Sequence, residues 1–111
     1  MKNSPAVPSA FAQRVYTALA RIPRGYVTTY GLLAHAINCK SPRAVGSALR
    51  KNPDPVTVPC HRVIRADLTI GGYKGRTGGS AVAEKKRLLA AEGVFFDKNR
   101  LRDPERIWVV L

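Results

Sequence analysis

The feature that most constrains this chain is a pair of short helical segments joined by a three-residue turn. Apolar residues at helical spacing predict the first segment at residues 30–37. Ser41 as a helix cap and Pro42 at the first helical position predict a second segment at residues 42–51. Residues 38–40 form the tight turn between them. Helix, short turn and helix is the helix-turn-helix pattern, although many small helical proteins contain it too.

The surrounding segments predict one domain, mainly α with small β-hairpins, of a winged helix-turn-helix-like type. Ser9 can cap a first helix that runs to about Arg21, before Pro and Gly break the pattern. Residues 62–65 and 70–73 predict a hairpin or wing. A helix is expected from its cap Ser80 to about Glu92. The apolar runs at residues 94–96 and 107–110 predict a terminal hairpin, or a strand and tail. Residues 1–8 predict a loose tail ahead of a domain at residues 9–111.

The charge of the chain favours a polyanionic partner. Nineteen Lys and Arg residues against seven Asp and Glu residues give a net charge of +12. Such an excess disfavours a compact state unless polyanion binding makes it useful, so nucleic acid is favoured over a merely basic, soluble protein. No apolar run approaches the roughly 18 residues of a membrane helix, and the first residues carry no signal-peptide core. We expect reduced cysteines, no membrane partner and an intracellular location, cytoplasmic in a prokaryote or nuclear in a eukaryote.

The second segment of the helical pair combines small and basic residues. Ala44, Gly46, Ser47 and Ala48 are small, and Arg43 lies at its start. Small side chains allow a close approach to another surface, and a DNA minor groove only ~6 Å wide would require them. Tight packing between helices is the alternative explanation. Together with the charge, the composition favours entry into a DNA groove.

The stretch Pro59-Cys60-His61-Arg62-Val63 places a thiol beside an imidazole. A thiolate is the attacking form of cysteine, so Cys60 would need nearby positive charge or a base such as His61. Neighbouring side chains in a strand point to opposite faces, so either the backbone turns sharply at Cys60 or a water bridges the two groups. The acid that orients His61 stays open among seven carboxylates.

Two simpler explanations of these residues remain. A cysteine in a small domain is most often buried and inert. A zinc site from His35, Cys39, Cys60 and His61 is conceivable, but adjacent Cys60 and His61 are poorly spaced as ligands. We therefore predict no metal.

In several separate motifs, the chain resembles the C-terminal domain of the O6-alkylguanine-DNA alkyltransferases (methylated-DNA–protein-cysteine methyltransferases). The matching pieces are Val27-Thr28-Thr29-Tyr30-Gly31, the run of residues 43–53 from Arg43-Ala44-Val45-Gly46 to Asn52-Pro53, Pro59-Cys60-His61-Arg62-Val63-Ile64, Gly71-Gly72-Tyr73 and Leu88-Leu89-Ala90-Ala91-Glu92-Gly93. Their order matches the family, and together they are specific. In size, the chain is also similar to the alkyltransferase-like proteins.

The resemblance implies a suicide methyltransferase that repairs DNA damage. Cys60 would accept the alkyl group of O6-alkylguanine directly and irreversibly, without a cofactor. His61, through a water, would take the thiol proton, and Glu92 would orient His61. Asn52 would brace the turn that carries Cys60. Tyr30 would donate a proton to guanine N3.

The resemblance also implies a DNA surface and a pocket. The partner would be double-stranded DNA containing O6-alkylguanine, bound by a monomer through the minor groove with the damaged base flipped out. Arg43 would fill the gap that the base leaves. The other implied DNA contacts are Tyr30, Gly31, Lys40, Ala44, Gly46 and Ser47. The implied alkylguanine pocket consists of Pro59, Val63, Tyr73 and Lys74, the last through its backbone amide. The segment from Lys74 to Gly79 makes the linker to the last helix longer than is typical of the family.

Two other functions stay open. Alkyltransferase-like proteins bind O6-alkylguanine in DNA and recruit excision repair, but commonly have Trp where this chain has Cys60. A non-enzymatic lesion sensor would therefore bind without transfer. A plain winged-helix DNA binder would be indifferent to alkylation, and would leave Cys60-His61 without a purpose.

Overall fold

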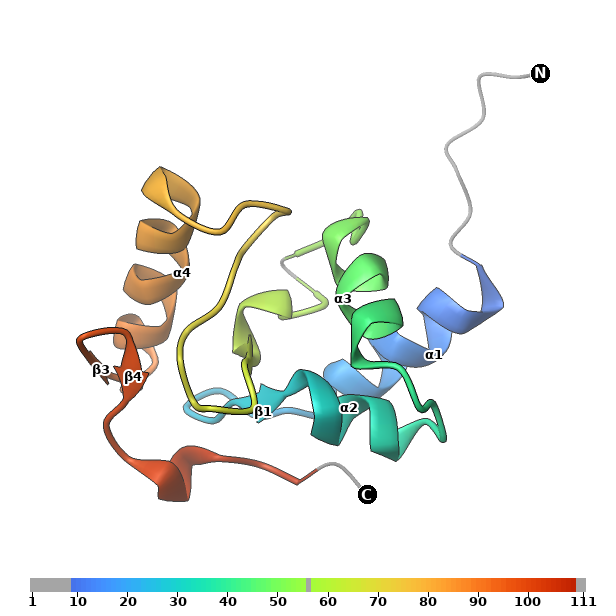
Figure 1. The fold of residues 1–111 in the computed structure, drawn as a ribbon, viewed down its shortest axis with the longest axis horizontal. Coiled ribbons are helices and arrows are strands. Elements are labelled where there is room, and N and C mark those ends of the chain that lie inside the picture. The colour runs from blue at the N-terminus through green and yellow to red at the C-terminus, as the bar shows by residue number, and fades with distance from the viewer. Residues whose placement is uncertain (1–8, 56, 110–111) are drawn as a thin grey trace.

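The computed structural model describes residues 9–55 and 57–109, so the predicted tail at residues 1–8 lies outside the described part. The elements in chain order are α1 (Ala10–Leu19), β1 (Thr28–Thr29), α2 (Tyr30–Ala36), α3 (Pro42–Arg50), the 3-10 turn η1 (Cys60–Arg62), β2 (Val63–Ile64), α4 (Gly79–Ala91), β3 (Phe96–Asp97), β4 (Arg100–Leu101) and the 3-10 turn η2 (Pro104–Arg106). Helices α1, α2 and α3 gather on one side, α4 lies on the other, and η1 with β2 runs between them (Figure 1).

The first three helices begin where the sequence predicts. The hydroxyl of Ser9 accepts from the Ala12 amide at 3.0 Å, and the hydroxyl of Ser41 accepts from the Ala44 amide at 3.1 Å. Thr29 caps α2 in the same way. Each bond satisfies an amide that has no partner within the helix. The helix-turn-helix pair and the mainly α fold class are confirmed, and α2 and α3 end one residue before the predicted position.

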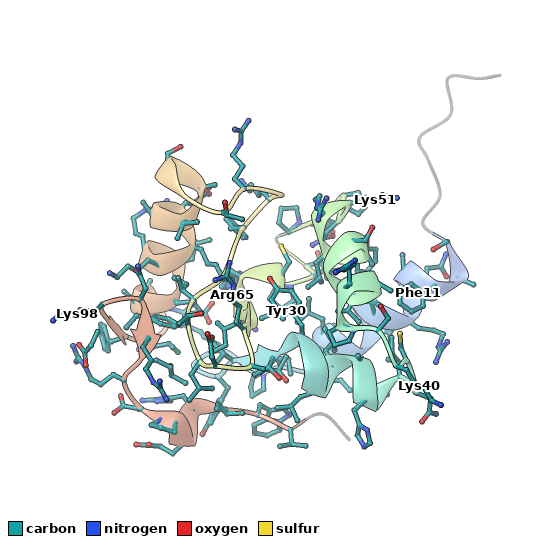
Figure 2. The ribbon with its side chains drawn as sticks, viewed as in Figure 1. Phe11, Tyr30, Lys40, Lys51, Arg65 and Lys98 are labelled. Atoms are coloured by element: carbon teal, nitrogen blue, oxygen red, sulfur yellow. The ribbon has the colours of Figure 1, made fainter. Side chains whose placement is uncertain are left out.

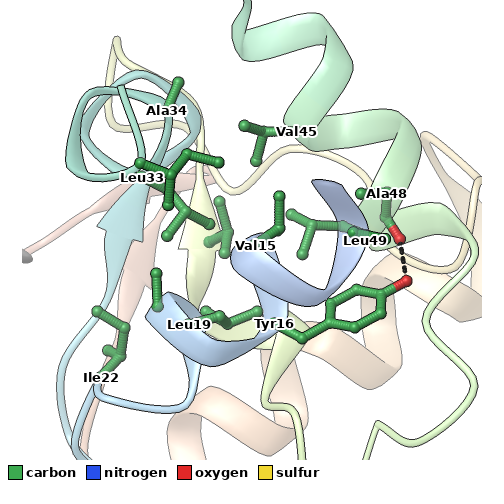
Figure 3. Packing of buried hydrophobic residues seen from close by; sticks show 13 residues of the cluster. Val15, Tyr16, Leu19, Ile22, Leu33, Ala34, Val45, Ala48 and Leu49 are labelled. Carbon is green, nitrogen blue, oxygen red and sulfur yellow. Dashed lines mark hydrogen bonds between the residues drawn. The ribbon is translucent and has the colours of Figure 1, made fainter. Parts of the chain in front are cut away.

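The three helices enclose the first core, whose fully buried members include Val15, Leu19, Leu33, Val45 and Val63. Figure 3 shows these helices packing through aliphatic side chains. The hydroxyl of Tyr16 donates to the Ala48 carbonyl at 2.7 Å and ties α1 to α3 (Figure 3). Periodic apolar faces therefore account for this half of the molecule.

A second core joins β1, β2, α4 and the terminal segment. It consists of Val27, Ile64, Ile70, Leu89, Val94, Phe96 and Leu101. Strands β1 and β2 pair in parallel, with Thr28 opposite Val63 and Thr29 opposite Ile64. This pairing connects the end of the η1 turn to the start of α2, and so fixes Cys60 relative to Tyr30.

Three predictions about the second half are wrong in detail. Residues 62–65 do not form a hairpin with residues 70–73, because β2 pairs instead with β1. The apolar run at 94–96 forms its hairpin with Arg100–Leu101, inside the charged stretch, while Ile107 bridges Val27. Ser80 does not cap α4, which begins one residue earlier after Gly78 and has no side-chain cap. In the first two cases a partner other than the predicted one overrides the local pattern.

Candidate active site on the Cys60 turn

Cys60 begins the 3-10 turn η1, so the backbone does turn sharply there. The Cys60 amide donates to the Val58 carbonyl at 2.8 Å, and the Arg62 amide donates to the Pro59 carbonyl at 2.9 Å. The side-chain amide of Asn52 donates to the same Val58 carbonyl at 3.0 Å. Asn52 therefore braces the loop that carries Cys60, in the position that the resemblance implies.

The half-buried Cys60 faces a hollow of about 480 Å³. Its wall includes Tyr30 and Gly31 at the start of α2, and Arg43 and Gly46 on α3. The opposite wall is the loop of residues 72–77, which includes Tyr73 and Lys74. A volume of this size is typical of pockets that hold small molecules. Figure 2 shows Tyr30 near the centre of the molecule, between α3 and the loop.

Most of the implied pocket and DNA residues are arranged around this hollow, but some are not. Pro59 and Val63 are buried and do not belong to the described lining. Lys40 is exposed in the turn between α2 and α3, and Ala44 and Ser47 are half-buried on α3 away from the lining. The hollow itself therefore depends on Tyr30, Gly31, Arg43, Gly46, Cys60, Tyr73 and Lys74.

His61 is buried and held by Glu92. The Nε2 atom of His61 lies 2.8 Å from Oε2 of Glu92. Burial pushes the pKa of Glu92 upward, but hydrogen bonds from Arg62 and His61 outweigh it and bring the pKa to about 2. Glu92 is thus an anion that can only accept, so Nε2 of His61 carries the proton.

The second ring nitrogen of His61 is consequently a free acceptor when the ring is neutral. Burial lowers the pKa of His61 below 6.5, although the Glu92 carboxylate opposes this change. The imidazole is therefore mainly neutral near pH 7. Its Nδ1 atom is buried and makes no hydrogen bond within residues 9–55 and 57–109. A neutral imidazole with one unpaired nitrogen can act as a base.

Glu92 also binds Arg62, which the sequence interpretation did not single out. Arg62 donates to both carboxylate oxygens of Glu92, each at 2.9 Å, and to the Ile22 carbonyl at 2.8 Å. Gly25 lies on the other side of Glu92. Its φ is +93°, and a Cβ added there would lie 3.3 Å from the Glu92 backbone oxygen. The loop after α1 therefore belongs to the support of His61.

Lys85 is the functional candidate that sequence reasoning missed. Its side chain is fully buried, and Nζ donates to the carbonyls of Val63, Ile70 and Gly72 at 2.7, 2.6 and 2.9 Å. These bonds attach α4 to β2 and to the segment that leads into the loop of residues 72–77. Burial lowers the pKa of Lys85 to about 7. The available signal was its spacing, because Lys85 falls on the α4 face that the buried Ala81 and Leu89 define.

The charges around Cys60 do not by themselves produce a thiolate. Burial raises the pKa of the Cys60 thiol above its usual 9.0. The Asn52 side chain and the positive charges of Lys85 and Lys74 oppose that rise without overcoming it. Of the two routes to a thiolate, nearby positive charge or a base, the charges alone are insufficient, because burial is the larger effect on the pKa of Cys60. A base is required for the thiol to react near neutral pH.

The alternative of a zinc site finds no support. His35 is exposed on α2 and Cys39 lies in the following turn, where its sulfur accepts from the Ser41 amide at 3.4 Å. Within residues 9–55 and 57–109, no three His, Cys, Asp or Glu side chains gather as metal ligands. None of the helices in this part of the chain is long and apolar enough to span a membrane.

Comparison with known proteins gives a consistent result. The family model described as "6-O-methylguanine DNA methyltransferase, DNA binding domain" matches residues 10–94. A methylated-DNA–protein-cysteine methyltransferase of Pyrobaculum aerophilum is 55% identical over 75 residues, which cover 68% of this chain and 47% of that protein. The chain spans about half the length of the curated relatives it matches.

Two solved structures have similar folds. The O6-methylguanine-DNA methyltransferase of Pyrococcus kodakaraensis has a TM-score of 0.68 and 49% identity, and the match covers 78% of this chain and 47% of that one. The Schizosaccharomyces pombe protein Atl1, in complex with damaged DNA containing O6-carboxymethylguanine, has a TM-score of 0.74 and 32% identity. That match covers 88% of this chain and 94% of Atl1.

Proposed function

The chain belongs to the family of the 6-O-methylguanine DNA methyltransferase DNA-binding domain, and from this membership we propose that it repairs O6-alkylguanine in DNA by transferring the alkyl group to Cys60. The observation that carries the proposal is the position of Cys60. Its thiol lines a hollow large enough for a base, and the adjacent His61 is held as a neutral base by Glu92.

The transfer would be a direct displacement that needs no cofactor. The thiol proton of Cys60 passes, through a water, to Nδ1 of His61, and the sulfur attacks the alkyl carbon. The bond between that carbon and guanine O6 breaks, and its electron pair stays on guanine. Tyr30 donates a proton to guanine N3, and burial keeps this phenol protonated by raising its pKa above 10.0. The thioether product is stable, so each molecule acts once.

The alkyl carbon becomes accessible only if the base leaves the duplex, at a cost of roughly a few kcal/mol. Arg43, exposed at the start of α3, would fill the gap in the stack while α3 lies in the minor groove. Arg43→Ala should slow repair in duplex DNA far more than transfer from the free alkylated base. Equal losses on both substrates would contradict a role in flipping. We propose that the protein repairs DNA as a monomer, in the cytoplasm of a prokaryote or in the nucleus of a eukaryote.

Intact-mass analysis tests the proposal directly. After incubation with duplex DNA that contains O6-methylguanine, the protein should gain the mass of one methyl group on Cys60. Cys60→Ser should gain none while still binding the DNA. Unchanged mass of the wild-type protein, with intact damaged DNA recovered, would contradict alkyl transfer.

A lesion sensor is the second candidate, and two observations favour it. The match to Atl1 covers nearly all of both chains, and burial raises the pKa of the Cys60 thiol. A sensor would bind alkylated duplex more tightly than plain duplex without any mass gain. The same incubation followed by a binding titration separates the two functions.

A further inference from the structure

The hollow beside Cys60 has a one-sided charge. Its lining includes Arg43, Arg50, Arg65, Lys74 and Arg76, and no Asp or Glu within the described residues. Arg50 and Arg65 act on Tyr30 inside the hollow, because their charges oppose the rise of its pKa. Figure 2 shows Arg65 beside Tyr30. Contact with DNA phosphates explains cations on an outer surface. These five cations, however, also line the hollow in which an extruded base would lie.

Lys74 is an exposed cation on the wall of the hollow that Cys60 also lines. Its positive charge opposes the rise in the pKa of Cys60. Its ammonium lies 5.4 Å from the centre of the Tyr73 ring, which also lines the hollow. Because Cys60, Tyr73 and Lys74 line the same hollow, a group attached to the carbon that Cys60 attacks would enter a cavity whose wall includes Lys74.

The turn that carries Lys74 is held in one position. Tyr73 and Arg76 exchange backbone hydrogen bonds at 2.8 and 3.0 Å. A Cβ on Gly72 would lie 2.6 Å from the Arg76 carbonyl, so only glycine permits this fold-back. Gly75, at φ +78°, lies against the Arg50 side chain, where an added Cβ would be 3.0 Å from Cγ. The turn is thus fixed against α3 across the hollow, which places Lys74 before any substrate arrives.

The present partner of Lys74 is easily replaced. Nζ lies 3.3 Å from Oε1 of Glu84 on α4, and the two side chains are 50% and 36% exposed. Ion pairs with this exposure contribute little, because water screens both charges. A carboxylate brought in by the substrate can therefore exchange with Glu84.

We infer that this site favours O6-alkylguanines whose alkyl group ends in a carboxylate, with the Lys74 ammonium binding that carboxylate. The inference rests on the proposed function and specifies its substrate class. With O6-carboxymethylguanine, sulfur bonds to the methylene carbon, the bond from that carbon to O6 breaks, and guanine keeps the electron pair. The thiol proton leaves through His61, guanine receives one from Tyr30, and Cys60 becomes S-carboxymethylcysteine.

The test compares two adducts of similar size in the same duplex, O6-carboxymethylguanine and its uncharged amide, O6-carbamoylmethylguanine. Both present the same phosphates, so the ratio of their transfer rate constants cancels phosphate contacts. Lys74→Gln should lower the acid-to-amide ratio by about three- to fivefold, as expected for one exposed charge contact. Glu84→Gln, which removes the competing carboxylate, should raise it. Lys98→Gln, on the β3–β4 turn, removes one positive charge elsewhere and should leave it unchanged.

Unchanged ratios in both Lys74→Gln and Glu84→Gln would overturn the inference while leaving alkyl transfer intact. An equal fall in Lys98→Gln would also overturn it, because net charge would then explain the effect. If no adduct, including O6-methylguanine, is transferred, the proposed function fails. The affinities for the two duplexes then decide the inference. The preference for the acid over the amide should fall in Lys74→Gln, rise in Glu84→Gln and stay unchanged in Lys98→Gln.

Discussion

The two cores of this molecule are held together differently. The first core is a set of aliphatic side chains between three capped helices, with one buried tyrosine hydroxyl bonded to Ala48. The second core is interrupted by ionic groups, because Lys85 is bonded to three carbonyls and Glu92 to Arg62 and His61. The helical half is therefore stabilised by apolar packing, while the other half uses buried polar contacts to hold the turn that carries Cys60.

Glu92→Ala should have the largest effect on stability, a loss of about 3–5 kcal/mol, because it leaves Arg62 and His61 without their buried anion. Urea unfolding measures this loss, and Glu92→Gln should lose less because it keeps the shape and one acceptor. The folded-state pKa of Glu92 is about 2 against an ordinary 4.5. Its contribution is therefore complete above pH 4.5 and disappears as the pH falls toward 2. A difference from wild type that stays constant across this window would contradict the ionic cross-link.

Leu19→Ala should remove about 3 kcal/mol from the unfolding free energy, because a fully buried side chain of the first core leaves a cavity. This loss should not change across the acid window in which Glu92 titrates, since Tyr16, Tyr30 and Cys60, which pack in or against the first core, all have pKa values raised above their ordinary 9.0 or 10.0. Thr17→Ala, at an exposed position of the same helix, is the matched control. A strongly pH-dependent loss for Leu19→Ala would erase the distinction between the halves.

Lys85→Met should cost about 2 kcal/mol, because it strands three carbonyls but also relieves the burial of a charge. The pH dependence is the sharper measure. The folded-state pKa of about 7 lies below the ordinary 10.5, so the unfolded chain binds more protons between these values. The Lys85 term therefore makes wild-type stability rise as the pH increases from about 7 to 10.5. That rise should be missing from Lys85→Met, and its persistence would show that another group causes it.

Ser9→Ala should have the smallest effect, a loss of about 1 kcal/mol, because only the cap of the Ala12 amide is removed. Thermal unfolding should register this loss while the transfer rate of the folded protein stays unchanged. A reduced transfer rate at full folding would show that the end of α1 is coupled to the reactive turn, and the two halves would then be less separate than described.

The helical half could be predicted from the sequence because its determinants are local. Caps at Ser9, Thr29 and Ser41 and apolar periodicity specify the helices before any tertiary contact is considered. The motif resemblance likewise implied the pairing of His61 with Glu92 and the bracing role of Asn52, and both contacts are present.

The other half resisted prediction because its determinants are distant in the sequence. The partner of β2 is β1, 35 positions away as Thr28 opposite Val63, and no local pattern specifies such a pairing. The burial of Lys85 could not be predicted from the sequence, since its three carbonyl acceptors come from segments outside its own helix. The raised pKa of Cys60 depends on burial, which the motif alone does not report.

The loop that contains Gly25 supports the residues next to Cys60, although it is distant from Cys60 in the sequence. Its positive φ lets the loop after α1 approach Glu92, and the Ile22 carbonyl in the same loop receives Arg62. A natural variant such as Gly25→Val would be classed by eye as a harmless change in a linker. Because any side chain at this φ is strained and its Cβ would lie 3.3 Å from the Glu92 backbone oxygen, we expect Gly25→Val to disturb the contacts of Glu92 with His61 and Arg62.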